Sequence, residues 1–89
     1  MDEMSWRAQL AKSNINILNI EWGNLRKVAD VYYEFMYHPY HGQTKWCKTW
    51  TTVRGKVDED SGISLEVTDL DILDALKGDV LELRKELED

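Results

Sequence analysis

The last third of the chain carries a helical repeat of apolar residues that limits how the rest can fold. These side chains recur at spacings of three and four, at Leu73, Leu76, Val80, Leu83 and Leu87, which predicts an amphipathic helix over about 69–88. Thr68 and Asp71 form the pattern of a capping box at its start. The resulting apolar seam must be covered, either by a sheet of the same chain or by the same helix of a second copy in a parallel homodimer.

Two segments before this helix predict a sheet that the seam could cover. Residues 45–57 are rich in threonine, valine and tryptophan, and they alternate between small side chains on one face and rings with cations on the other, as a strand does. Residues 63–68 alternate between apolar and polar side chains and predict a second strand. Pairing Val57 with Ile63 sets apolar residues opposite one another on one face and opposite charges on the other. The sequence therefore predicts a two-stranded antiparallel hairpin.

The first half of the chain is predicted to be helical. Residues 4–12 read as a short helix, and a second helix over 14–37 follows from apolar residues spaced by three and four, namely Leu18, Trp22, Leu25, Ala29, Tyr32 and Met36. Alternation over 14–17 leaves a short strand as an alternative at the start of this segment. Pro39 should end the helix near Tyr37. The predicted fold is one α+β domain spanning 1–89, in the order α-α-β-β-α, with the hairpin packed against the helices.

Charge and aromatic residues are sorted along the chain. All nine aromatic residues precede position 51, and 12 of the 17 acidic residues lie from Asp58 onward. The net charge is +3 over residues 1–57 and −9 over residues 58–89. Such sorting bears on association and solubility rather than on fold, so we expect a macromolecular partner.

The aromatic residues predict one set of partner contacts and the acidic residues another. Tyrosine and tryptophan are enriched at the centres of protein interfaces, and the expected anchors are Tyr33, Tyr37, Tyr40, Trp46 and Trp50. Acidic residues of the loop and the last helix would orient a basic partner, and these are Asp58, Glu59, Asp60, Asp74, Asp79 and Glu82. The prediction is a protein-binding module, in its more specific form an accessory inhibitor or regulator that occupies a basic or anion-binding site of a larger protein.

Single-stranded nucleic acid is the alternative partner. Trp46, Trp50, Lys48, Arg54 and Lys56 share one face of the predicted hairpin, and rings with cations suit stacked bases and phosphates. The competing interpretation is that both tryptophans are covered by a helix. A net charge of −6 disfavours nucleic acid, because phosphate neutralisation supplies most of the non-specific affinity.

Catalysis, cofactors and metals are not predicted. His38, His41 and Cys47 are too few for a four-ligand zinc site, and the chain has no glycine-rich phosphate loop or nucleophile motif. A single cysteine favours a reducing compartment, and the sequence shows neither a signal peptide nor a membrane span. We therefore expect a cytoplasmic protein that is not an enzyme.

Overall fold

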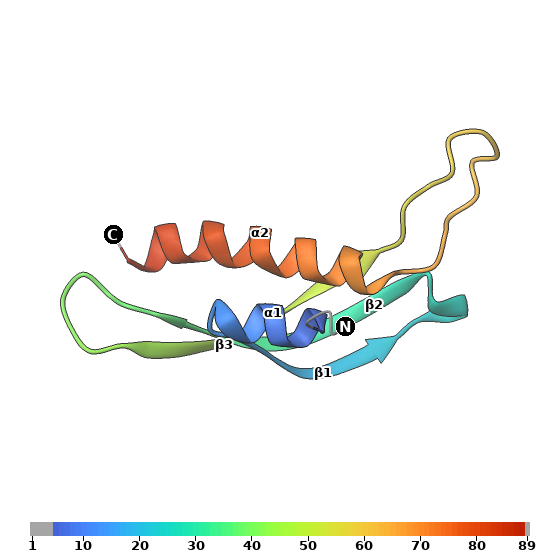
Figure 1. The fold of residues 1–89 in the computed structure, drawn as a ribbon. Helices are drawn as coiled ribbons and strands as arrows, with labels where there is room; N and C mark the ends of the chain where they lie inside the picture. The colour runs from blue at the N-terminus through green and yellow to red at the C-terminus, as the bar shows by residue number, and fades with distance from the viewer. Residues whose placement is uncertain (1–4, 89) are drawn as a thin grey trace.

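The computed structural model describes residues 5–88. Its elements are α1 (Trp6–Lys12), β1 (Ile15–Trp22), the short 3-10 helix η1 (Asn24–Arg26), β2 (Val28–Tyr37), β3 (Lys45–Arg54) and α2 (Asp69–Leu87). The strands form one antiparallel sheet in the order β1-β2-β3, and both helices lie on the same face of it (Figure 1). The α+β class is confirmed, whereas the predicted order of elements and the two-stranded sheet are wrong.

The predicted helix over 14–37 is instead the β1-η1-β2 hairpin. The side chains of β2 alternate, with Ala29, Val31, Tyr33 and Phe35 buried and the residues between them only partly covered. This period of two outweighs the helical spacing because β-branched and aromatic residues fill a half-buried pleated surface well. Leu25 belonged to the expected helical stripe, yet it is 67% exposed in the turn between the strands.

The predicted strand over 45–57 exists, but its partner is different. Its regular part is β3, which pairs along its whole length with β2, so that Tyr33 lies opposite Thr49. The segment 63–68 is not a strand: it forms only an isolated bridge between Val57 and Ser64, one residue away from the predicted pairing. A ten-residue ladder with β2, closed by the short connection over 38–44, satisfies far more backbone groups than the predicted hairpin would.

The C-terminal helix is confirmed, together with its start. The hydroxyl of Thr68 accepts a hydrogen bond from the backbone N–H of Asp71 at 3.1 Å, and the Asp71 carboxylate accepts one from the N–H of Thr68 at 2.9 Å. The seam of α2 packs into the core formed with α1 and the sheet, where the buried residues include Leu10, Phe35, Ile72, Leu76 and Val80. The seam is therefore covered within the protomer from Leu73 to Leu83, whereas Leu87 at its end is 37% exposed.

The predicted N-terminal helix over 4–12 is found as α1, except that residue 4 lies outside the described residues. The hydroxyl of Ser5 accepts a hydrogen bond from the N–H of Ala8 at 3.1 Å and caps this helix. Its buried residue, Leu10, joins the core below α2. One short helix and one long helix thus cover a single face of the sheet and leave the other face open.

Candidate functional site

Residues 55–68, here called the arm, project from the body of the protein between β3 and α2 (Figure 1). Both ends are tied to the turn before β2. The N–H of Gly55 donates to the carbonyl of Lys27 at 3.1 Å, and the N–H of Val67 donates to the carbonyl of Arg26 at 2.8 Å. The arm is therefore anchored at its base, while the part between the anchors extends outward.

The two limbs of the arm hold each other through a short run of backbone hydrogen bonds. The N–H of Leu65 donates to the carbonyl of Lys56 at 2.7 Å, and the N–H of Asp58 donates to the carbonyl of Ile63 at 2.9 Å. A side chain at Gly55 would place its Cβ only 1.8 Å from the carbonyl oxygen of Leu65. Because glycine has no Cβ, the backbones of the two limbs can pass each other in direct contact at this position.

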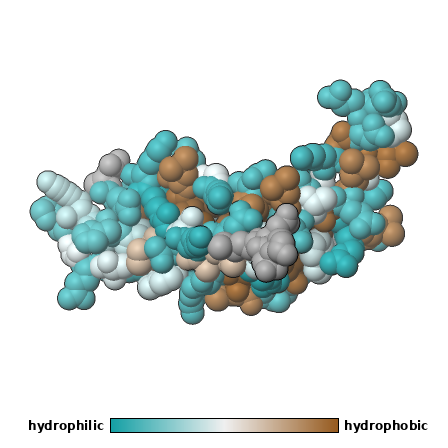
Figure 2. Space-filling view, viewed as in Figure 1, coloured by the Kyte–Doolittle hydropathy of each residue, from teal (hydrophilic) through white to brown (hydrophobic). Residues whose placement is uncertain are grey.

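The surface of the arm combines apolar limbs with an acidic tip. Val57, Ile63 and Leu65 are 58%, 56% and 48% exposed, and the carboxylate side chains of residues 58–60 all lie in solvent. Figure 2 shows this sorting, with hydrophobic residues directly below the end of the projecting segment and hydrophilic residues at the end itself. Because Val57 pairs with Ser64, it lies on one face of the arm, whereas Ile63 and Leu65 lie on the other. Both faces therefore expose apolar surface of the kind that marks contact sites.

The predicted acidic residues divide between the arm and the outer surface of α2. Asp74 and Glu82 are exposed on the helix, whereas Asp79 is half-buried. Glu82 has a nearby cation, since one of its oxygens lies 3.7 Å from Nζ of Lys85. The acidic tip of the arm makes no ion pair with any of residues 5–88. The negative charge of the tip is therefore less compensated by nearby cations than that of the acidic residues on α2.

The predicted tyrosine patch does not exist as one surface. Tyr33 is 1% exposed in the core, so its predicted surface position is wrong, because the residue belongs to a strand rather than a helix. Burial raises the pKa of Tyr33 to about 12, and the carboxylate of Asp79 adds to this shift. Tyr37 is half-buried, while Tyr40 is 66% exposed in the loop before β3 and stacks on His41 with ring centroids 4.4 Å apart.

Trp46 and Trp50 lie on the face of the sheet opposite α1 and α2, and they are 48% and 58% exposed. The predicted sharing of one face holds for both rings, Lys48 and Arg54, but not for Lys56, which lies beyond β3 with its Nζ 3.8 Å from the Asp71 carboxylate of α2. The interpretation that a helix covers both rings is wrong. The ring of Trp50 lies 6.2 Å from that of Tyr32 on β2. Sequence reasoning missed the acidic residues of this face because it assigned β2 to a helix, although Glu34 lies directly opposite Lys48.

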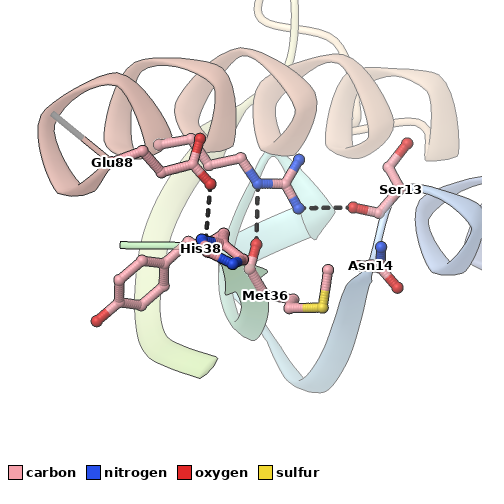
Figure 3. Close-up of a pocket in the computed structure, with 7 residues that line it drawn as sticks. Ser13, Asn14, Met36, His38 and Glu88 are labelled. Carbon is pink, nitrogen blue, oxygen red and sulfur yellow. Dashed lines mark hydrogen bonds between the residues drawn. The ribbon is translucent and has the colours of Figure 1, made fainter. Parts of the chain in front are cut away.

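A pocket of about 380 Å³ lies between the ends of α1, β2 and α2 (Figure 3). Arg84 crosses it, donating from Nε to the carbonyl of Met36 at 2.9 Å and from Nη2 to the carbonyl of Ser13 at 2.8 Å. The carboxylate of Glu88 accepts a hydrogen bond from the N–H of His38 at 2.8 Å. These polar groups hold three elements together, so the pocket serves as a structural junction.

Within residues 5–88, no three histidine, cysteine, aspartate or glutamate side chains come together in an arrangement suited to a metal ion. Nor does this part of the chain contain a helix long and apolar enough to cross a membrane. Comparison with protein families, curated proteins and solved structures finds no match to the chain. The fold and the exposed surfaces therefore carry the functional argument alone.

Proposed function

We propose that this chain is a protein-binding module without catalysis, whose arm inserts into a basic site of a larger protein. The observation that supports the proposal is the arm itself, which presents three exposed apolar side chains beneath an uncompensated acidic tip. An apolar side chain that passes from water into a partner contributes about 1.5–3 kcal/mol when fully buried. The limbs of the arm thus supply affinity.

The tip supplies orientation and selectivity. Its three adjacent carboxylates, Asp58, Glu59 and Asp60, are exposed, and such a charge raises the rate of encounter with a basic surface and disfavours acidic partners. A basic groove that accepts phosphate or other anions has the complementary charge. Occupation of such a groove by the tip would exclude its usual ligand, which makes an inhibitor or regulator the specific form of the proposal.

Charge-neutral variants of the tip test this function. Asp58→Asn, Glu59→Gln and Asp60→Asn together preserve size and remove three charges, so the affinity for a protein captured from the native host should fall at least about tenfold. The captured protein should be released by heparin, a polyanion, and its binding should weaken as salt rises. Replacing Val57, Ile63 and Leu65 with serine should also abolish capture.

The matched control is the acidic set on the helix. Asp74→Asn, Asp79→Asn and Glu82→Gln remove the same charge from α2 and should weaken capture less than the tip variant does, because Glu82 is already partly compensated by Lys85. If the helix variant loses the partner while the tip variant retains it, the contact lies on α2 and the proposed role of the arm is wrong. Circular dichroism of both triple variants would verify that they remain folded.

A further inference from the structure

The face of the sheet opposite the helices, here called the open face, carries a second apolar surface distinct from the arm. On it the exposed rings of Trp46 and Trp50 lie across from Met36 and Tyr32 of β2. In the described part of the chain neither helix covers this face (Figure 1). Apolar rings on an uncovered sheet mark an interaction site, and we propose that its occupant is the same face of a second copy.

The charges of the open face are sorted by strand. β2 contributes the carboxylates of Asp30 and Glu34, while β3 contributes the cations of Lys48 and Arg54. Neither cation makes an ion pair with any of residues 5–88. The carboxylates are held by neutral groups: Asp30 accepts a hydrogen bond from the hydroxyl of Thr52 at 2.8 Å, and Glu34 accepts one from the side-chain amide of Asn16 at 3.2 Å. One basic row and one acidic row therefore run side by side.

Two copies can stack with their open faces together around a twofold axis that runs parallel to the strands, between β2 and β3. This axis places the basic row of each copy over the acidic row of the other. It lays β3 of one copy over β2 of the other, and the register of the sheet sets which residues meet. Lys48 then faces Glu34 of the second copy, and Trp50 faces its Tyr32. A twofold interface repeats each contact, so the Lys48–Glu34 pair and the Trp50–Tyr32 pair each occur twice, whereas Arg54 faces Val28 in the same register.

The size of the face sets the expected strength of the dimer. Two strands of ten residues span about 33 Å by about 10 Å, or about 330 Å² on each copy, which is smaller than a standard interface and fits a weak, transient dimer. Stacked sheets pack about 10 Å apart, with their side chains interdigitated. We expect a dimer with a dissociation constant in the micromolar range, roughly 1–100 μM.

Sedimentation equilibrium of the full chain tests the dimer. Lys48→Glu places two carboxylates together at each of the matched contacts and should weaken association at least about tenfold, because like charges at an interface are strongly unfavourable. Glu34→Lys alone should do the same. The double variant restores opposite charges and should recover the dimer.

The control is Lys77→Glu, which makes the same change of charge at an exposed position on α2 and should leave the dimer intact. Trp50→Ala should weaken association, and its circular dichroism spectrum would show that the fold is kept. A wild-type chain that stays monomeric at about 0.5 mM, a concentration well above the expected dissociation constant, overturns the proposal. Failure of the double variant to recover the dimer would also overturn it.

A third measurement separates this proposal from nucleic-acid binding. Single-stranded oligonucleotide should leave the tryptophan fluorescence of the dimer unchanged. If it instead quenches the fluorescence and dissociates the dimer, the open face binds bases and the proposal is wrong. The proposed function of the arm is tested separately, since the neutral tip variant should dimerise as the wild type does.

Discussion

Gly78→Ala offers a direct test of how α2 is held. Gly78 lies in the middle of the helix on its exposed side, and a Cβ added there meets nothing within 4 Å. Alanine is favoured over glycine in a helix interior by about 0.8–1.0 kcal/mol. With no packing change to offset this gain, the free energy of unfolding should rise by about 1 kcal/mol, and the midpoint of thermal unfolding by about 4–8 °C for a domain of this size.

Urea unfolding followed by far-ultraviolet circular dichroism measures the effect. The midpoint should shift while the slope with urea stays constant, because the surface exposed on unfolding does not change. The measurement belongs at protein concentrations below the expected dissociation constant of the dimer, since association itself adds apparent stability.

The same substitution at Gly62 serves as the control. Gly62 has a φ of +73° at the tip of the arm, where alanine is strained, so Gly62→Ala should destabilise the protein or leave it unchanged, and should not stabilise it. If Gly78→Ala failed to stabilise, Gly78 would not lie in a regular, uncovered helix, and the assignment of the outer face of α2 to solvent would be wrong.

Three further perturbations test the core and its junctions. Burial holds the pKa of Tyr33 at about 12, above its unfolded value of about 10, so the folded state binds the phenol proton more tightly than the unfolded state does. The contribution of this group to the free energy of unfolding is therefore complete below about pH 10 and should be lost as the pH rises toward 12. Tyr33→Phe should flatten that part of a stability profile measured by urea titration at each pH. Thr68→Ala should cost about 1 kcal/mol and Thr68→Ser much less, because only the hydroxyl caps α2; an equal loss in both variants would argue against the cap. Arg84→Met should cost about 2 kcal/mol in chemical denaturation, because two charged hydrogen bonds to backbone carbonyls disappear, and an unchanged midpoint would show that the junction does not need them.

The sequence predicted the elements whose signals are local. Thr68 and Asp71 cap α2 through neighbouring backbone groups, and the spacing of three and four alone defines which side of α2 is apolar. The alternation of β3 was equally clear, since Trp50 and Val53 occupy opposite faces as expected. Such patterns require no knowledge of the partner element.

The sequence could not identify the partner strands, because two periods compete over 18–36. A spacing of three and four joins Leu18 to Met36, while a spacing of two joins Ala29 to Phe35, and only tertiary pairing decides between them. β2 is the central strand and is paired on both sides, which stabilises the second pattern. The predicted exposure of each candidate residue depends on which period is assigned. The helical period places Tyr33 on the surface and does not bring the acidic residues of the open face together.

Gly55 and Val67 donate to the carbonyls of adjacent residues, Lys27 and Arg26, so the two ends of the arm meet at one place on the body. The sheet ladders and the core contacts of α2 lie outside the segment between them. The chain between these two anchors can therefore be exchanged as a cassette. A short glycine-rich bridge or a foreign peptide of similar length could be grafted there at a small cost in loop-closure entropy, since that cost grows only slowly with length. The scaffold could then display peptide segments of other sequences.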